Sequence, residues 1–312
     1  MLAVFAQALV AALGLASQPP DPLAPLAPRE KAALVVVSGL PAPGGVAGVL
    51  VRRWDRDSVR PPRALVFVDQ EGGGVRALPE LPPATWPSAY GSVRAAFAAG
   101  RATGRALRRA GVDVDLAPVV DAPTGPLGLR HFRAPRFAVA FARGLVAGGV
   151  AGCAKHFPGL GTASHSTDER IRVPARVTRH ELAAFRRAIR VGLPCVMTSH
   201  AVYRRFGWKR AVTSPAAYRL LRRIGFDGVA VTDSLSVASG PWPVRWAVRA
   251  VRAGADLVLF TSPRDARRAI RALLPLARDG VLDVHVRRVL SLRRSLGLAR
   301  LPATSGERRR RW

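Results

Sequence analysis

Short apolar runs rich in β-branched residues alternate along this chain with longer stretches in which apolar residues recur three and four positions apart. The first pattern is typical of buried strands and the second of amphipathic helices. Strands that alternate with helices form a parallel sheet, because each crossover returns the chain to the same end of the sheet. We predict strands over Ala33–Leu40, Val46–Val51, Ala64–Val68, Val112–Ala117, Val150–His156, Pro194–His200, Gly228–Thr232 and Asp256–Phe260.

Helices are expected between most of these strands. Thr178 with Glu181 three residues later has the capping-box spacing, and Ser214-Pro215 suits a helix start. Eight buried strands with intervening helices favour an α/β fold of the (β/α)8 TIM-barrel type, as a single domain. A doubly wound sheet is the alternative, but the turn after the first strand lacks the glycine spacing of a phosphate-binding turn. The expected helices are Val93–Ala110, Phe137–Ala147, Thr178–Val191, Ala216–Ile224, Trp242–Ala253, Pro263–Leu276 and Asp283–Leu296.

The two ends of the chain differ from the middle in composition. Residues 1–16 are apolar apart from Gln7 and resemble the core of a signal peptide, although the first basic residue is Arg29. An N-terminal helix packed on the domain is the alternative, so the sequence leaves export open: extracytoplasmic with a signal peptide, cytoplasmic without one. Residues 18–28 are proline-rich and indicate a linker. We therefore predict an apolar segment and linker over 1–28, a barrel over 29–300 and a basic tail over 301–312.

The charge is strongly positive, with 49 Lys+Arg against 20 Asp+Glu and a formal net charge of +29. Nearly all of the basic residues are arginine, and they are scattered along the chain apart from Arg308–Arg311. This pattern favours a solvated basic surface. It leaves association with an anionic cell-wall polymer open and predicts no nucleic-acid partner, since no nucleic-acid motif accompanies it. The two cysteines, Cys153 and Cys195, exclude a disulfide scaffold, and we expect them as buried thiols.

Polar and charged residues directly follow five of the predicted strands. The strands of a barrel all end at one rim, where the active sites of such proteins lie. One polar strand end alone would indicate local capping, but five together predict a site lined with hydrogen-bond donors and acceptors. Such a lining suits a polyhydroxylated ligand, because each hydroxyl both donates and accepts. The segments are Asp69-Gln70-Glu71-Gly72-Gly73, residues 118–121, Lys155-His156-Phe157-Pro158-Gly159, Thr198-Ser199-His200 and Thr232-Asp233-Ser234.

These segments resemble glycoside hydrolase family 3, and within it the single-barrel β-N-acetylhexosaminidases. The most specific matches are Lys155-His156-Phe157-Pro158-Gly159 and Gly225-Phe226-Asp227-Gly228 followed by Thr232-Asp233. The matching segments occur in the family's order and span roughly residues 33–298. The second α/β domain of larger members is not expected here.

The resemblance implies a retaining mechanism in which a carboxylate attacks the anomeric carbon while a second group protonates the leaving oxygen. Asp233 matches the family's nucleophile. We expect Asp121 to organise the rim of the barrel instead of binding the ligand directly, and a structural ion pair, for example with Asp121, is the alternative role of Lys155. Arg76 lies one position before the arginine of the family pattern and is a further candidate for binding. The residues that match sugar-binding positions are Asp69, Arg130, Lys155, His156 and His200.

The loop after Gly159 departs from the family pattern, in which an Asp-Ser-His element supplies the acid/base pair. Here the corresponding residues are Ser166-Thr167-Asp168, and His165 precedes them. His165 and Asp168 are therefore the candidates for acid/base catalysis, with three hypotheses. They act as a pair, Asp168 acts alone with a pKa raised by burial, or the acid/base is lost.

The sequence thus predicts an exo-acting, retaining β-glycosidase that removes N-acetylglucosamine from cell-wall (peptidoglycan) fragments. A catalytically weak sugar-binding barrel of the cell envelope is the main alternative, and a β-glucosidase or β-xylosidase on the same scaffold is another. The expected partner is a carbohydrate substrate. No metal and no nucleotide cofactor are expected, because the histidines lack zinc-ligand spacing and no phosphate-binding turn is present.

Overall fold

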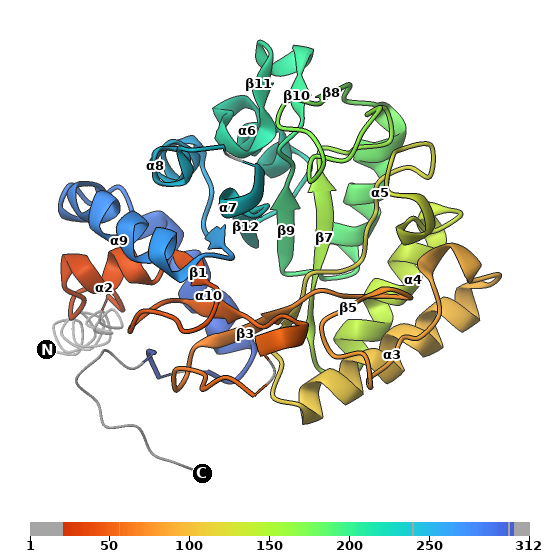
Figure 1. The fold of residues 1–312 in the computed structure, drawn as a ribbon, viewed down its shortest axis with the longest axis horizontal. Coiled ribbons are helices and arrows are strands. Elements are labelled where there is room, and N and C mark those ends of the chain that lie inside the picture. Colours follow the sequence, from red (N-terminus) through yellow and green to blue (C-terminus); the bar gives the residue numbers. More distant parts are fainter. Residues whose placement is uncertain (1–20, 56, 239, 299, 303–312) are drawn as a thin grey trace, which may run out of the picture.

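The computed structural model describes residues 21–302 except 56, 239 and 299, and it contains one barrel of parallel strands (Figure 1). The strands are adjacent in the order β12-β9-β7-β6-β3-β2-β1-β13. A bridge between Val231 and Leu257 joins the two ends of this order and closes the barrel. The (β/α)8 fold is confirmed, and the doubly wound alternative is wrong. The strands are β1 (Val36–Ser38), β2 (Gly48–Leu50), β3 (Leu65–Val68), β6 (Val114–Asp115), β7 (Ala151–Phe157), β9 (Cys195–Thr198), β12 (Val229–Thr232) and β13 (Val258–Phe260).

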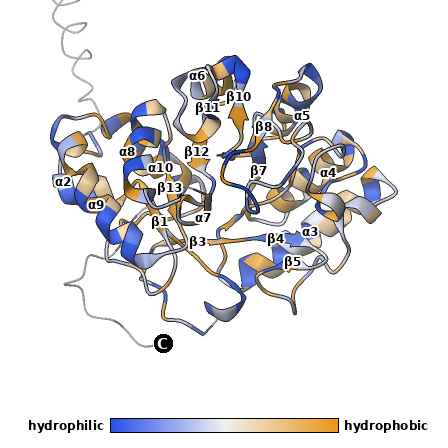
Figure 2. Ribbon diagram, turned by 45° about the horizontal axis from the view of Figure 1, so that its top comes forward, coloured by the Kyte–Doolittle hydropathy of each residue, from blue (hydrophilic) through white to orange (hydrophobic). Residues whose placement is uncertain are grey.

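Two apolar layers hold the barrel together. Alternate strand residues such as Phe67 and Met197 fill its interior, where Val289 and Leu292 of the last helix join them. Their neighbours along the strands face outward and pack against the helices. Both faces of each strand are therefore buried, which explains the continuous apolar runs in the sequence. Figure 2 shows these strands as a mostly hydrophobic centre surrounded by helices with hydrophilic outer faces.

The predicted helices are present, with ends shifted by a few residues. Ala33 lies in a short helix before β1 instead of in the first strand, and another short helix follows Ser234. Among the described residues, no α-helix connects β1 to β2 or β2 to β3. The helices are α2 (Pro28–Ala33), α3 (Val93–Arg109), α4 (Pro135–Ala147), α5 (Arg179–Arg190), α6 (Pro215–Arg223), α7 (Leu235–Ala238), α8 (Pro243–Ala253), α9 (Pro263–Arg278) and α10 (Asp283–Ser295).

Helices α3 and α4 lie side by side on one flank of the barrel (Figure 1). Their backbones approach closely where glycines face the partner helix. A methyl group on Gly100 would collide with the carbonyl oxygen of Phe141, and one on Gly144 would collide with that of Phe97. The glycines in these helices therefore serve packing, which offsets their low helix propensity.

The proline-rich segment before α2 is part of the packed domain. Leu23 and Leu26 are buried in the same core cluster as the helices, so packing begins a few residues before the expected start at Arg29. The apolar segment 1–16 lies outside the described residues. Within the described residues, no helix is both long and apolar enough to cross a bilayer.

Cys153 and Cys195 are joined by a disulfide, so the expectation of two free thiols is wrong. The cysteines are direct partners in the register of β7 and β9, and both side chains point into the barrel interior. Spacing in the sequence does not reveal this pairing, because register between neighbouring parallel strands depends on the whole sheet.

Candidate active site

The carboxyl ends of the strands bring the predicted polar residues to one mouth of the barrel. Asp69 follows β3, Lys155 and His156 lie at the end of β7, His200 follows β9, and Asp233 follows β12. Each belongs to a strand whose apolar residues fix its register, so the backbone at the mouth is held by the core below. The sequence prediction of a polar rim is confirmed.

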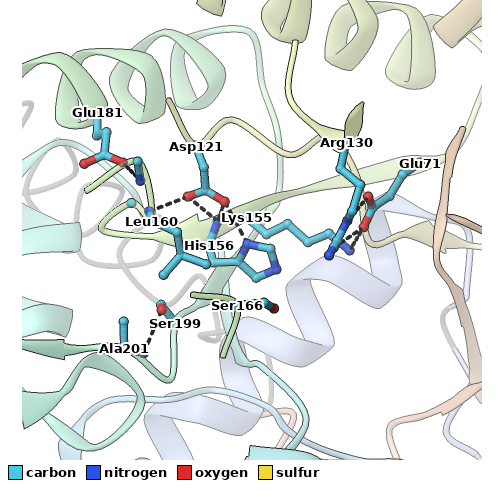
Figure 3. Close-up of polar contacts among 12 residues, drawn as sticks. Glu71, Asp121, Arg130, Lys155, His156, Leu160, Ser166, Glu181, Ser199 and Ala201 are labelled. Carbon is cyan, nitrogen blue, oxygen red and sulfur yellow. Dashed lines mark hydrogen bonds and ion pairs between the residues drawn. The ribbon is translucent and has the colours of Figure 1, made fainter. Parts of the chain in front are cut away.

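An ion-pair cluster lies at one side of this mouth (Figure 3). Lys155 Nζ is 2.6 Å from both Asp69 Oδ1 and Glu71 Oε1. Arg130 donates from Nε and Nη2 to the two carboxylate oxygens of Glu71, at 2.7 and 2.8 Å. Burial alone would raise the pKa of Glu71, but the charges of Lys155 and Arg130 outweigh it and hold that pKa at about 2. The fork–fork geometry fixes the guanidinium of Arg130, and two carboxylates fix the ammonium of Lys155.

A third carboxyl group, Asp115, lies near this cluster and has a different environment. It is fully buried, and its Oδ1 accepts a hydrogen bond from the amide of Gln70 at 3.0 Å. Burial raises the pKa of Asp115 well above its usual value, and the charges of Asp69 and Glu71 add to this effect. This shift favours the protonated form of Asp115, although the hydrogen bond from Gln70 and the charge of Lys155 act in the opposite direction.

Glu71 and Asp115 were not selected as site residues from the sequence. Glu71 lies in the segment Asp69-Gln70-Glu71-Gly72-Gly73 at the end of a predicted strand, so its position and charge already indicated a site residue. Asp115 lies inside a predicted strand, where an acidic residue between apolar neighbours was the available signal.

His156 is oriented by Asp121 (Figure 3). Nδ1 of its ring lies 2.8 Å from Asp121 Oδ2, and Asp121 also accepts hydrogen bonds from the amides of His156 and Leu160. A carboxylate partner makes Nδ1 the protonated nitrogen of the neutral ring and leaves Nε2 to act as an acceptor. Asp121 thus orients another side chain instead of occupying the mouth itself, in agreement with the expected organising position.

His200 is held by protein partners on both ring nitrogens. Nε2 lies 3.0 Å from the carbonyl oxygen of Ser234, so it carries the proton. Nδ1 lies 3.5 Å from Nη1 of Arg210 and accepts from it. Burial lowers the pKa of His200, which keeps the ring neutral. The ring lies against the backbone next to Asp233. Both of its nitrogens contact protein groups, so they do not make the sugar contact that the resemblance implies.

Asp233 itself is half-buried at the end of β12. Its amide donates to the carbonyl oxygen of Thr198 at 3.0 Å, which ties it to the neighbouring strand. Its Oδ1 accepts from the amide of Ser234 at 2.7 Å. This local turn and the brace from His200 fix the direction of the carboxylate.

The loop after β7 brings Asp168 into electrostatic contact with Asp233. Asp168 is exposed at the surface of the loop. Desolvation by the surrounding protein nevertheless raises its pKa, and the negative charge of Asp233 raises it further, while His156, Arg130 and Lys155 act in the opposite direction. The amide of Asp168 donates to Ser166 Oγ at 3.2 Å, so this short turn shapes the loop.

His165 lies in a different environment from Asp168. Its Nδ1 is 2.9 Å from Ser164 Oγ, and no hydrogen bond joins it to Asp168 in the described loop. In the described loop, His165 and Asp168 are therefore not joined by a hydrogen bond, and the charge of Asp233 acts on Asp168.

Arg76 is occupied within its own loop. Its guanidinium donates to the carbonyl oxygens of Gly73 and Pro79, at 2.7 and 2.6 Å. It shapes the segment after β4 (Gln70–Gly72) and β5 (Val75–Arg76). Arg76 lies one position before the arginine of the family pattern. In the structure its guanidinium binds backbone carbonyls of its own loop instead of extending toward the mouth.

Glu181 of α5 anchors the start of the loop that carries Asp168, and the sequence analysis did not select it as a site residue. Its Oε1 accepts from the amide of Gly161 at 2.5 Å, and Thr178 donates to Oε2 at 3.1 Å. The helix cap is present, because Thr178 accepts from the amide of Glu181, and the Glu181 side chain connects this cap with the loop. Burial raises the pKa of Glu181 to about 7.

This pKa predicts how stability depends on pH. An unfolded Glu181 loses its proton near its usual value of 4.5, whereas the folded protein keeps it up to about pH 7. Between these values the folded state binds more protons, so the free energy of unfolding falls as pH rises, by at most about 3 kcal/mol. We expect Glu181→Gln to remove most of this slope in urea denaturation at pH 5 and pH 8. The exposed Glu169→Gln is the matched control, and equal slopes for all three proteins would contradict the assignment.

The barrel and the order of the segments at its mouth are shared with a known family of proteins. The family model described as "Glycosyl hydrolase family 3 N terminal domain" matches residues 50–292. The chain belongs to glycoside hydrolase family 3 and is a glycoside hydrolase. Among the described residues, no three His, Cys, Asp or Glu side chains gather in a way that could hold a metal ion.

Individual relatives agree with this family. A beta-hexosaminidase of Thioalkalivibrio sulfidiphilus is 35% identical over 244 residues, which cover 69% of this chain and 70% of the relative. A beta-N-acetylhexosaminidase structure from Beutenbergia cavernae matches with a TM-score of 0.74 and 28% identity, over 87% of this chain and 99% of that one. A family 3 beta-N-acetylglucosaminidase structure from Paenibacillus matches with a TM-score of 0.75 and 28% identity, and this chain covers 90% of its own length and 65% of that protein.

Proposed function

We propose that this protein is a retaining exo-β-N-acetylhexosaminidase that removes terminal N-acetylglucosamine from peptidoglycan fragments. The observation that carries the proposal is the carboxylate of Asp233, fixed at the end of β12 by the Ser234 amide, whose negative charge raises the pKa of Asp168 in the neighbouring loop. Two interacting carboxyl groups of which one holds a proton are what a retaining glycosidase requires. The sugar is suggested by the relatives, which are named beta-hexosaminidase and beta-N-acetylglucosaminidase.

Asp233 is the nucleophile in this proposal. Since its Oδ1 is engaged by the amide of Ser234, Oδ2 is the oxygen that attacks the anomeric carbon. His200 is a positioning residue that holds the Ser234 carbonyl and so keeps the Asp233 turn in place. The ionised carboxylate also stabilises the positive charge that develops on the sugar ring.

Asp168 is the acid/base. In the first step, the glycosidic C–O bond breaks as Asp233 bonds to C1, and Asp168 gives its proton to the leaving oxygen. In the second step, Asp168 takes a proton from water, the water oxygen bonds to C1, and Asp233 is released. The raised pKa of Asp168 favours the protonated form that the first step needs. As the sugar becomes bound to Asp233, the negative charge that raises this pKa disappears, which favours the base form for the second step.

The ion-pair cluster and His156 bind the sugar. Lys155 and Arg130 present donors fixed by Glu71, Asp69 presents a half-exposed acceptor, and Nε2 of His156 accepts from a hydroxyl. Hydroxyl groups that both donate and accept match this mixture. Contacts of this kind strengthen as the ring distorts toward the transition state and supply several kcal/mol in glycosidases.

A panel of aryl glycosides tests the proposal. We expect turnover of aryl β-N-acetylglucosaminide with retention at the anomeric carbon, followed by NMR, and a much lower rate with the corresponding β-glucoside and β-xyloside. Faster cleavage of the glucoside or xyloside would mean that the enzyme acts on another sugar by the same mechanism, which would contradict the substrate assignment.

The altered acid/base loop favours one rival, a sugar-binding barrel with weak or no catalysis. That rival predicts binding of N-acetylglucosamine, measured by calorimetry, without turnover even of an activated aryl glycoside. A measurable rate that Asp233→Asn abolishes excludes it.

A further inference from the structure

Arg210 is a buried cation at the edge of the catalytic mouth. Strand β10 (Val202–Tyr203) begins two residues after His200, and β11 (Lys209–Arg210) pairs with it in antiparallel register, with Arg210 opposite Val202. This hairpin returns the chain to a position next to His200 and leaves Arg210 only 8% exposed. Burial lowers the pKa of Arg210. Contacts of the guanidinium must therefore compensate for the water that it has lost.

The guanidinium of Arg210 contacts three different elements. Its Nη1 lies 3.5 Å from Nδ1 of His200, which follows β9. Its Nη2 donates to the carbonyl oxygen of Ile171, in the loop that carries Asp168. Its Cζ lies 5.0 Å from the ring centroid of Trp246 on α8, so this ring supports one face of the guanidinium plane. A planar group held in this way cannot turn toward one partner without releasing another, which makes Arg210 a stiff link between them.

The contact with His200 determines which nitrogen of the ring carries the proton. A guanidinium only donates, so Nδ1 of His200 must accept, and the proton of the neutral ring lies on Nε2. Nε2 donates to the carbonyl oxygen of Ser234 at 3.0 Å, directly after Asp233. The other tautomer would place two donors against each other at Arg210 and two acceptors at Ser234. Arg210 therefore favours the tautomer in which His200 braces the nucleophile turn.

The charge of Arg210 also acts on the protonation of His200. Burial has the largest effect and lowers the pKa of this ring, the negative charge of Asp233 raises it, and the positive charge of Arg210 lowers it again. Hydrogen bonds to the backbone of Ser234 and Asp233 raise it as well. Without Arg210, the charge that remains beside the ring is the carboxylate of Asp233, which favours a protonated His200. A protonated ring would pair with that carboxylate and weaken its attack on C1.

The second contact of Arg210 lies at the end of the loop that carries Asp168. In this loop the amide of Arg170 donates to the carbonyl oxygen of Ser166 at 3.2 Å, which closes a turn around Asp168. Ile171 follows the turn directly, so the hydrogen bond from Arg210 fixes the loop just after Asp168. The same guanidinium thus restrains the nucleophile turn and the acid/base loop.

We propose that Arg210 is a positioning residue of the glycosidase reaction, which holds His200 in its bracing tautomer and ties the loop of Asp168 to the turn of Asp233. This inference rests on the proposed function and adds a residue that acts through His200 and Ile171 instead of on the sugar. A displacement of about 1 Å at a reacting group lowers a rate by about 10²-fold, so the loss of such a link is measurable.

Arg210→Met tests the link, because methionine keeps an unbranched stem and removes every donor. We expect kcat for an aryl β-N-acetylglucosaminide to fall about 10²-fold while KM stays within about 3-fold, since the lost contacts orient reacting groups. The acidic limb of the kcat/KM profile should also move to higher pH, because His200 then gains a proton more readily. Lys209→Met changes an exposed cation on the same strand and is the matched control, which should behave as the unaltered protein in both respects.

Arg210→Lys separates the charge of Arg210 from its shape, and it carries the test where circular dichroism shows that Arg210→Met is unfolded. Lysine keeps a positive charge near His200 but has no fork that binds His200 and Ile171 together. We expect the acidic limb to return to its original pH, while cleavage of a glycoside with a poor leaving group, which depends on Asp168, stays about 10-fold slow. Full recovery of that rate would contradict the link to the loop. In a His200→Gln background, Arg210→Met should cost much less, because one of its two partners is gone.

NMR of the histidine rings separates this inference from the proposed function, because it needs no substrate. Long-range ¹H–¹⁵N spectra report the tautomer, and the signals that vanish in His200→Gln assign the ring. We expect the proton on Nε2 in the unaltered protein, and protonation of His200 at a higher pH in Arg210→Met. The same tautomer and titration in both proteins, or equal kinetic losses in Arg210→Met and Lys209→Met, would overturn the inference. Failure of the proposed function would appear separately, as absence of turnover of the aryl N-acetylglucosaminide by the unaltered protein.

Discussion

Asp233→Asn is expected to lower kcat for an aryl β-N-acetylglucosaminide by about 10⁴-fold or more. The amide keeps the size of the side chain and still accepts from the Ser234 amide, so the turn at the end of β12 survives. The amide oxygen is a far weaker nucleophile and carries no negative charge to stabilise the developing oxocarbenium ion. Steady-state kinetics measures the loss, and circular dichroism checks that the variant is folded.

Asp227→Asn provides a matched control, because Asp227 is exposed just before the same strand. We expect that variant to retain wild-type kcat. Incubation with a 2-deoxy-2-fluoro glycoside, followed by mass spectrometry of peptides, identifies the attacking residue. A covalent adduct on any residue other than Asp233 would disprove the assigned nucleophile.

Asp168→Ala is expected to lower the rate about 10²- to 10⁴-fold for a glycoside with a poor leaving group, and less for an activated aryl glycoside. The difference arises because an activated leaving group departs without a proton. Azide should restore turnover of the activated substrate and give a glycosyl azide, since azide attacks the glycosyl-enzyme without needing a base.

The pH profile adds a second test of Asp168. A general acid must be protonated, so kcat/KM should fall as pH rises through the raised pKa of Asp168, and this alkaline limb should disappear in Asp168→Ala. His165→Ala should leave the rate within about 3-fold of the wild type, because its ring contacts Ser164 and not Asp168. A loss in His165→Ala as large as that in Asp168→Ala would instead support a working pair of the two residues.

The barrel was predictable because each of its strands is specified by a short stretch of neighbouring residues. Each strand is a short apolar run between turn residues, and all eight predicted runs coincide with strands of the barrel. The rim residues followed from the same reasoning, since strand ends in a barrel share one side. The exception at Ala33 also has a local cause, because the apolar residues of α2 and β1 are continuous in the sequence and periodicity does not separate them.

The parts that were not predictable depend on distances between remote residues. The disulfide requires Cys153 and Cys195 to be in register, and the raised pKa of Asp115 depends on its burial and on the charges that surround it. Glu181 was predicted only as part of a helix cap, because its contact with Gly161 crosses twenty residues of loop. The roles of Asp168 and His165 stayed open in the sequence for the same reason.

The segment that carries Asp168 is fastened at both ends by side chains from other elements. Glu181 holds the amide of Gly161 at one end, and Arg210 holds the carbonyl of Ile171 at the other. Within this span, Asp168 and Glu169 are exposed, whereas Ala163, Ser166 and Thr167 are buried. Exchange of an exposed residue removes less packing than exchange of a buried one, so the two anchors allow the sequence to vary at such positions while the strand below Asp233 keeps its apolar residues.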